Sequence, residues 1–361
     1  MTTCYQLLSG ALPGLPQDAG DLVRRLERTA WPSLPVDEAW ANGAPMPLIR
    51  RYSRGWARWL EQPQLPTVGQ HEIVEAEGSS VHVVRFEGSG RVPVLLLHGW
   101  PTSFLAFHRV IEPLREIGSE LVLASLPGFG TTPLPSQGWS ITDSAVLLAS
   151  AMAQLGHDRF VVHGQDWGSV LAREIGAHAP DRVIAVHVSA GLRGFMADGT
   201  TADSAWTRLR EFAIDGAGYL QLQSRRPDSL AFALADSPTG LLAWQLDKYQ
   251  LWQSALGEHF GLGADFIFAN ATLYWLTRSV GSSMRVYSVN RDVQGAAASR
   301  VPTGVSVFGN GDFASSAVAS RENNLVAWYE HTTGGHVAAL DAPTEFVADL
   351  TDFVHRTGEL R

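Results

Sequence analysis

The sequence has a single cysteine, a single lysine and no long apolar run. The lone Cys4 excludes a disulfide within the chain and a zinc site built from several cysteines, and it is typical of a reducing compartment. Because Lys248 is the only lysine, almost all basic residues are arginines. We attribute this bias to GC-rich codon usage and not to an arginine-built binding surface.

Membrane-directed segments are also absent from the sequence, which is consistent with a reducing cytoplasm. No stretch of about 18 apolar residues occurs, so we expect no transmembrane helix. The first residues lack the basic segment of a signal peptide, and Gly and Pro interrupt their apolar stretch. We therefore expect a soluble, cytoplasmic protein without a membrane anchor.

The sequence also has few basic residues relative to acidic ones. The 36 acidic residues outnumber the 27 basic ones, which gives a formal net charge of -9 and argues against nucleic acid as a partner. The composition, 45% hydrophobic and 17% charged, suits a globular protein with a sizeable core. A length of 361 residues allows one large α/β domain with an insertion, or two smaller domains. The sequence leaves the oligomeric state open, a homodimer included.

Strand and helix patterns alternate along much of the chain. Residues 74–78 and 80–86 predict a hairpin at a sheet edge. The apolar runs that follow predict strands at Val92–Leu97, Leu121–Ser125, Arg159–His163 and Val183–Ser189, with helices at Phe104–Ile117, Ile141–Leu155 and Ser169–Ala179. This rhythm predicts an α/β fold, with a mostly parallel central sheet and helices on both faces.

The rhythm stops after Leu192 and resumes near Val301. We therefore divide the chain into an N-terminal extension (1–75) that packs on core and lid, a first core part (76–192), a helical lid (193–299) and a second core part (300–361). The remaining predicted elements are helices at Asp18–Thr29, Pro47–Leu60 and Thr344–His355 and strands at Val301–Phe308 and Val326–His331. Catalytic groups are expected at the carboxyl ends of the strands, below the lid.

The strongest motif is Gly164-Gln165-Asp166-Trp167-Gly168, between a predicted strand and a helix. It has the form of the nucleophile elbow of the α/β-hydrolase fold, with Asp166 where serine is usual. The glycines permit a sharp turn that lifts this side chain above the sheet and leaves the N–H of Trp167 free to bind an oxyanion. The alternative is that Asp166 only caps the helix.

A second motif, His98-Gly99-Trp100-Pro101, directly follows a buried strand. Here the fold supplies its second oxyanion donor, which predicts that role for the N–H of Trp100. Pro101 would fix the loop, and we expect Trp100, Pro101 and Trp167 to border the substrate. An ordinary strand-ending turn is the alternative, and His98 is better explained as a structural residue than as a base.

The base and its orienting acid come late in the chain. His336, in Gly334-Gly335-His336, follows both candidate acids, which gives the α/β-hydrolase order of nucleophile, acid and histidine. The acid is then Asp312, after the penultimate strand, unless it is simply a turn aspartate. An aspartate nucleophile suits displacement at saturated carbon, because it forms an ester whose carbonyl water can attack once His336 has activated that water.

At these residues the chain resembles the epoxide hydrolases, in particular the microsomal-type branch with an N-terminal extension. The resemblance covers nearly the whole chain and rests on segments 98–104, 126–130, 164–168, 301–308 and 334–343. Two departures stand out. The acid loop, Gly309-Asn310-Gly311-Asp312, is one residue longer than the family's usual motif, and Trp56–Leu60 deviates from the family's pattern near the substrate tunnel.

The resemblance also implies two lid tyrosines that hydrogen-bond the epoxide oxygen, and its motifs match at Tyr219 and Tyr287. It thus implies an epoxide and water as the reactants, a vicinal diol as the product, and neither a cofactor nor a metal. Aromatic lid residues suggest a bulky apolar or aryl epoxide: Trp206, Phe212, Phe232, Trp244, Trp252, Phe266 and Phe268. The alternatives are a haloalkane or haloacid dehalogenase with the same aspartate, whose halide Trp167 could bind, and a non-catalytic hydrolase-fold binding protein.

Overall fold

The structure, a computed structural model, describes residues 19–34, 40–63, 69–88, 91–135, 139–200, 204–252, 258–291, 298–309 and 311–359. Cys4 and Asn310 lie outside these residues.

An eight-stranded sheet runs through the centre of the core, in the order β1-β2-β4-β3-β5-β6-β7-β8. β2 pairs antiparallel with both β1 and β4, and every other pair is parallel. The strands are β1 (Gln70–Ala76), β2 (Ser79–Phe86), β3 (Arg91–Leu97), β4 (Ser119–Ala124), β5 (Phe160–Gln165), β6 (Val183–Ser189), β7 (Ser299–Val307) and β8 (Asn323–Glu330). The mostly parallel sheet and the hairpin at its edge are confirmed.

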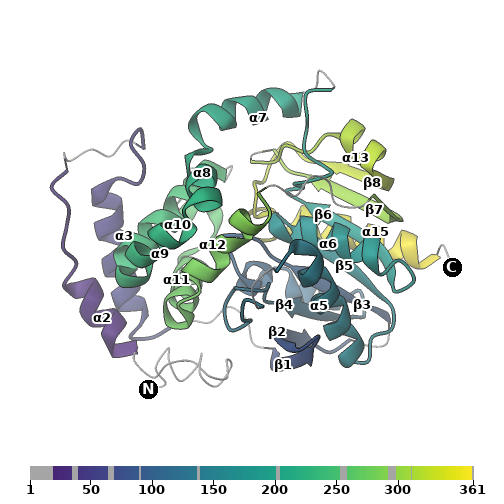
Figure 1. The fold of residues 1–361 in the computed structure, drawn as a ribbon, viewed down its shortest axis with the longest axis horizontal. Helices are drawn as coiled ribbons and strands as arrows, with labels where there is room; N and C mark the ends of the chain where they lie inside the picture. The colour runs from purple at the N-terminus through teal and green to yellow at the C-terminus, as the bar shows by residue number, and fades with distance from the viewer. Residues whose placement is uncertain are drawn as a thin grey trace.

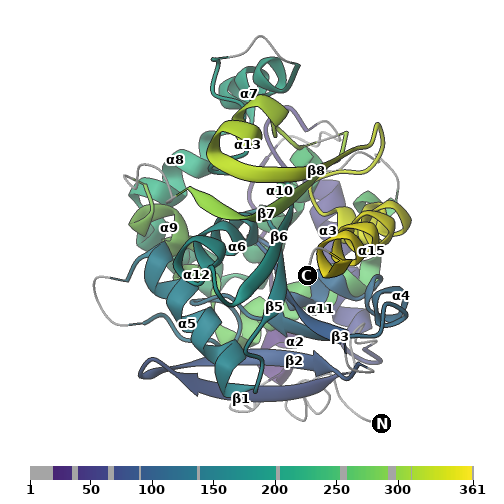
Figure 2. The same ribbon diagram turned by 90° about the vertical axis from the view of Figure 1, so that its right-hand side faces the viewer.

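Apolar side chains on both faces of the central strands explain the two layers of helices. Along β3, Leu96 packs into one apolar cluster and Leu95 and Leu97 into another. The first cluster joins α4 (Ile111–Arg115) and α15 (Pro343–Glu359), and the second joins α5 (Ile141–Gln154) and α6 (Trp167–His178). Figure 2 shows α5 and α6 on one side of the sheet and α4 and α15 on the other.

The prediction of one helix over Phe104–Ile117 is wrong. A 3-10 helix, η1 (Phe104–Phe107), comes first, and α4 begins only at Ile111. The Ser103 side chain accepts the N–H of Leu105, and tight bonds three residues apart continue to Val110. The chain therefore turns more sharply after β3 than an α-helix would allow.

Two further boundaries differ from the sequence prediction. A short helix, α13 (Ser316–Glu322), was not predicted, and β8 starts at Asn323 directly after it, earlier than the predicted Val326. β1 starts at Gln70, inside the region 1–75 that we assign to the N-terminal extension. The two strands β8 and β1 start earlier than predicted because pairing with a neighbouring strand extends each of them beyond its apolar residues.

Helices fill the described part of the chain between β6 and β7, as a lid over the strand ends. They are α7 (Ser204–Asp215), α8 (Gly218–Arg225), α9 (Pro227–Asp236), α10 (Pro238–Trp252), η2 (Glu258–Gly261), α11 (Ala264–Thr277) and α12 (Val280–Val289). Figure 1 shows α2 (Ala19–Glu27) and α3 (Met46–Trp59) against the side of this lid that faces away from the sheet. The indole N–H of Trp56 donates to Thr272 at 2.8 Å, and that of Trp59 donates to Asp265 at 2.8 Å.

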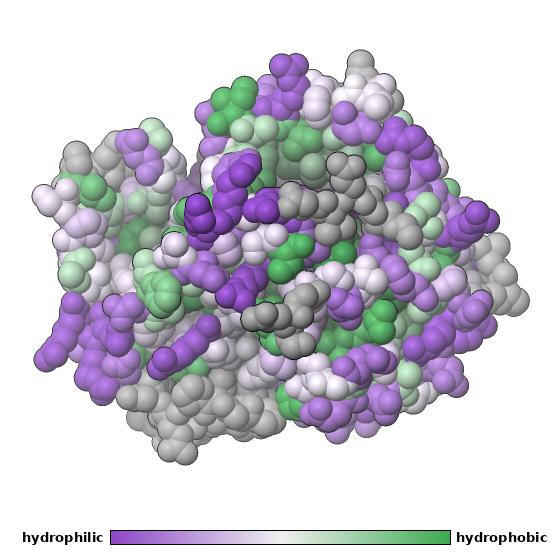
Figure 3. All heavy atoms as spheres, in the orientation of Figure 1, coloured by the Kyte–Doolittle hydropathy of each residue, from purple (hydrophilic) through white to green (hydrophobic). Residues whose placement is uncertain are grey.

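Exposed apolar side chains are scattered among hydrophilic ones on the face that Figure 3 shows, and they form no continuous band there. Within the described ranges, no helix combines the length and the apolar character that crossing a membrane requires.

Candidate active site

Asp166 lies at the turn between β5 and α6 in a strained backbone conformation, with φ 54° and ψ -124°. The flanking glycines make this turn possible. A Cβ on Gly164 would lie 2.0 Å from the carbonyl oxygen of Gly168, and a Cβ on Gly168 would lie 2.2 Å from that of Leu97. The Asp166 side chain makes no hydrogen bond to the start of α6, so the helix-cap interpretation is wrong.

The carboxylate of Asp166 is almost buried and has two partners from distant loops. Its Oδ1 accepts the backbone N–H of Trp100 at 2.8 Å, and its Oδ2 lies 3.1 Å from Nε2 of His336. The N–H of Trp167 is the first of α6 and has no acceptor within the helix. One carboxylate oxygen therefore accepts the predicted oxyanion donor at Trp100, and the other faces the predicted base.

Gly99 must be glycine for this arrangement, because a Cβ there would lie 2.2 Å from Oδ1 of Asp166. We expect Gly99→Ala to displace the nucleophile and lower kcat by about 100-fold, the effect of a displacement of about 1 Å. Steady-state kinetics with circular dichroism as a folding control checks this. Gly78→Ala, on the open turn between β1 and β2, is the control for glycine replacement as such. Normal turnover by Gly99→Ala would contradict the prediction.

His336 is held from both sides by backbone atoms. Its Nδ1–H donates to the carbonyl oxygen of Gly311 at 2.9 Å, and its backbone N–H donates to Trp252 at 3.1 Å. Burial alone would lower the pKa of His336, but the hydrogen bond and the charge of Asp166 outweigh it and raise this pKa above its usual value.

Asp312 lies beside His336 but does not pair with it directly. Its buried carboxylate accepts the backbone N–H groups of Ala190 at 3.2 Å and Ala314 at 3.0 Å, and no ion pair joins it to His336 among the contacts of the described residues. Burial raises the pKa of Asp312. The Gly311 carbonyl therefore accepts the imidazole Nδ1–H of His336, while the Asp312 carboxylate acts on the imidazole through its charge.

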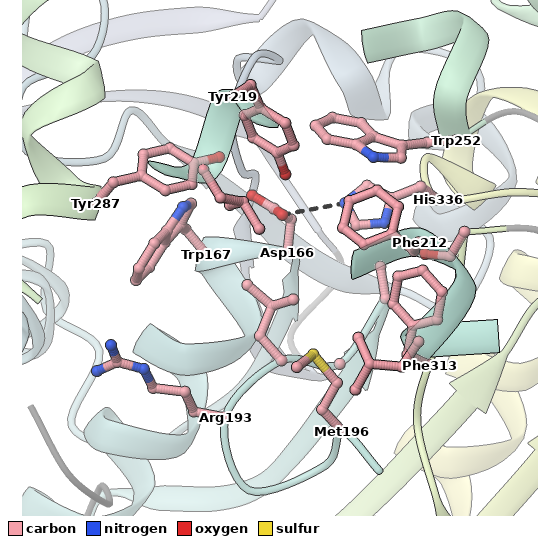
Figure 4. Close-up of a pocket in the computed structure, with 16 residues that line it drawn as sticks. Asp166, Trp167, Arg193, Met196, Phe212, Tyr219, Trp252, Tyr287, Phe313 and His336 are labelled. Atoms are coloured by element: carbon pink, nitrogen blue, oxygen red, sulfur yellow. Dashed lines mark hydrogen bonds and ion pairs between the residues drawn. The ribbon is translucent and has the colours of Figure 1, made fainter. Parts of the chain in front are cut away.

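Tyr219 from α8 and Tyr287 from α12 approach the nucleophile from the lid. Figure 4 shows both hydroxyl groups pointing toward Asp166. Their rings meet edge to face at 6.0 Å, and Trp100 stacks on Tyr219 at 5.9 Å. Burial, with the charge of Asp166, raises the pKa of both phenols well above 10.0, so that both are protonated hydrogen-bond donors at neutral pH.

Three other lid residues hold the Trp100 loop, and sequence reasoning missed this role. Asn270 donates to the carbonyl oxygen of Pro101 at 2.8 Å, and Tyr249 donates to the same oxygen at 3.4 Å. Tyr274 donates to the carbonyl oxygen of Thr102 at 2.9 Å. The acceptors are backbone atoms, which leave no signal in the sequence.

A cavity of about 210 Å³ opens beside Asp166 and His336. Its walls are mostly apolar: Trp167, Ala190, Gly191, Leu192, Arg193, Met196, Leu209, Phe212, Tyr219, Leu220, Trp252, Tyr287, Gly311 and Phe313. Of the three residues predicted to border the substrate, Trp167 lines this cavity, and Trp100 and Pro101 are absent from its walls.

Of the seven aromatic lid residues that suggest a bulky substrate, Phe212 and Trp252 line this cavity. Phe232 is 80% exposed, while Phe266 and Phe268 pack in the core. No three His, Cys, Asp or Glu side chains cluster suitably for a metal ion within the part of the chain that the structure describes.

A mostly parallel sheet, a sharp strand–turn–helix elbow that carries Asp166 and a histidine on the loop after the last strand are typical of the α/β-hydrolase class. Comparison with known proteins agrees: residues 92–243 match the alpha/beta hydrolase fold model, and residues 15–107 match the model of the epoxide hydrolase N terminus.

A Stigmatella aurantiaca protein provisionally described as an epoxide hydrolase is 31% identical over 94% of this chain and 82% of its own length. Epoxide hydrolase 1 of Sus scrofa is 25% identical over 94% of this chain and 86% of its own. The Aspergillus niger epoxide hydrolase structure superposes with a TM-score of 0.81 at 26% identity, covering 94% of this chain and 93% of that one. The chain belongs to the epoxide hydrolase family and is a hydrolase.

Proposed function

We propose that this enzyme hydrolyses an apolar or aryl epoxide to a vicinal diol through an ester on Asp166. The observation that carries the proposal is the placement of two phenol donors opposite the elbow carboxylate at the edge of one apolar cavity (Figure 4). The family supports it, since relatives of similar length are described as epoxide hydrolases.

In the first step Oδ2 of Asp166 attacks an epoxide carbon and the carbon–oxygen bond of the ring breaks. Tyr219 and Tyr287 hydrogen-bond the departing oxygen, and one of them gives it a proton. The protein now carries a hydroxyalkyl ester, and its carbonyl oxygen is Oδ1, which already accepts the N–H of Trp100.

In the second step His336 takes a proton from water, and the resulting hydroxide attacks the ester carbon. The negative charge that develops on Oδ1 is stabilised by the N–H groups of Trp100 and Trp167. The ester bond breaks, the departing oxygen takes the second proton of the attacking water, and the diol leaves with Asp166 again a carboxylate. The proton on His336 returns to the tyrosine. Gly311 and Asp312 serve this step by orienting the imidazole and stabilising its positive charge.

Halide displacement is the second candidate. The indole N–H of Trp100 is buried without an acceptor among the described residues, as a halide site would require, whereas the indole of Trp167 contacts Tyr287. A halide leaving group needs no proton, however, so the paired phenols would not be needed as proton donors in halide displacement.

A panel of styrene oxide and haloalkanes separates the two functions. We expect diol without halide release, and about a 100-fold slower reaction when either Tyr219 or Tyr287 is changed to phenylalanine, because each variant removes a hydrogen-bond donor from the leaving oxygen. Product analysis and halide detection make the measurement, and Tyr329→Phe, a tyrosine beyond the cavity, is the matched control. Halide release without diol would overturn the proposal.

A further inference from the structure

The chain's single lysine, Lys248, is buried in the lid. It lies on α10 with 3% of its surface exposed, where lysines are rarely found unless they are paired. Every other obligate cation in this sequence is an arginine. The only lysine ammonium of the chain is therefore enclosed by protein.

Two aromatic rings and one carboxylate surround this ammonium. Its Nζ lies 4.8 Å from the ring centroid of Tyr219 and 4.6 Å from that of Trp244, and it also pairs with the neighbouring Asp247. Burial lowers the pKa of Lys248, and the hydrogen bond and charge of Asp247 oppose that effect. An ammonium over an aromatic face is attracted by the ring, and the attraction grows as water is excluded.

The ring of Tyr219 is the link to the reaction. Trp100 stacks on it and Trp252 meets it edge to face at 5.5 Å, so the ring is held by its surroundings. The charge of Asp166 opposes negative charge on its oxygen. An ammonium on the ring has the opposite effect, because a nearby positive charge favours the phenolate.

We infer that Lys248 is a positioning residue for epoxide ring opening and acts through Tyr219. Its ammonium holds the ring with the hydroxyl toward the epoxide oxygen and stabilises the negative charge that the phenol gains as it donates its proton. The inference rests on the proposed epoxide hydrolysis and concerns its first step only. Attack of water on the ester does not involve Tyr219 as a donor and is therefore independent of Lys248.

Pre-steady-state kinetics on the full chain tests this by measuring ester formation and ester hydrolysis separately. We expect Lys248→Met to slow ester formation about tenfold, the size of a desolvated cation–π contact, and to leave ester hydrolysis unchanged. Lys248→Arg retains a cation that stacks on aromatic rings and should recover part of the rate. If Lys248→Met does not fold, Lys248→Gln against Lys248→Arg makes the same comparison.

Double variants show whether the effect passes through Tyr219. In a Tyr219→Phe background Lys248→Met should cost less than about twofold, whereas in the matched Tyr287→Phe background the tenfold loss should remain. Equal losses in both backgrounds, or equal slowing of both steps, would overturn the inference and leave the proposed function standing. A wild-type protein that forms no diol and no ester would overturn both.

The contact itself has a readout that does not need activity. Lysine labelled with 15N and 13C gives one side-chain signal set, because the chain has one lysine. We expect Tyr219→Leu to shift these signals through loss of the ring current, and Tyr329→Leu to leave them in place. Lysine side-chain signals that do not shift in Tyr219→Leu would overturn the inference.

Discussion

His336→Gln should stop the reaction halfway and leave the opened epoxide attached to Asp166. The first step needs only the carboxylate and the two phenols, which this variant retains. The second step needs a base for water, and His336 is the imidazole whose Nε2 lies 3.1 Å from the nucleophile. Loss of a general base slows a step by about 100- to 10,000-fold, so the ester should accumulate within one turnover.

Intact-mass spectrometry would detect the trapped ester as one added substrate mass, and peptide mapping should place it on Asp166. Asp166→Ala removes the attacking oxygen and should give neither adduct nor diol. His331→Gln is the matched histidine control, since His331 hydrogen-bonds Asp349 away from the cavity, and it should turn over normally. Diol formation by His336→Gln at the wild-type rate would contradict the two-step mechanism.

A steep loss of stability on mild acidification is the second large effect. His82, His98, His163 and His187 are fully buried. Burial lowers the pKa of His82 and His187 to about 3 and that of His98 to about 4, and it lowers the pKa of His163 well below 6.5. Each histidine is therefore neutral in the folded chain at a pH where the unfolded chain would protonate it.

The sign of this pH dependence follows from the numbers of protons that the folded and unfolded chains bind. Between pH 6.5 and the lowered pKa values the unfolded chain binds more protons, so the free energy of unfolding is largest above pH 6.5 and falls as the pH drops. Each histidine contributes about 1.4 kcal/mol per pH unit, so four of them remove on the order of 5 kcal/mol by about pH 5.5, a large part of a typical stability.

Four groups have the opposite sign. Burial raises the pKa of Asp341 to about 6, and it also raises the pKa of Asp312 and of Glu174, so protonation of these carboxyls favours the folded chain. The raised pKa of His336 adds stability below 6.5 that is lost as the pH rises through it. Burial also lowers the pKa of His71 to about 4 and that of His108, so six histidines outnumber these four groups and the net slope stays downward toward acid.

Urea unfolding at several pH values between 5 and 7 would measure this slope. His82→Gln, which keeps hydrogen-bonding groups near Ser125, should lower the slope by about one proton. His355→Asn, at an exposed position on α15, should leave the slope as it is. A free energy of unfolding that stays flat over this range would contradict the prediction.

The elbow and the positions of the central strands could be predicted because local sequence determines them. Gly164 and Gly168 are required by close backbone contacts, and continuous apolar runs mark strands buried on both faces. The partner of His336 could not be predicted, because it is the backbone carbonyl of Gly311 and a backbone acceptor leaves no signal in the sequence. Lys248 was also missed as a site residue: α10 has apolar and polar side chains on all sides, so its buried face has no periodic pattern.

The bonds from Asn270, Tyr249 and Tyr274 to the Trp100 loop constrain how substrate can reach the cavity. If α10 and α11 swung away from the sheet as a rigid cover, they would pull on the loop that carries the N–H of Trp100. Opening would then dismantle the oxyanion site. We therefore expect substrate to enter past side chains of the cavity wall, such as Met196 and Phe212, while α10 and α11 keep their places. On this expectation, α10 and α11 act as a fixed wall and not as a moving cover.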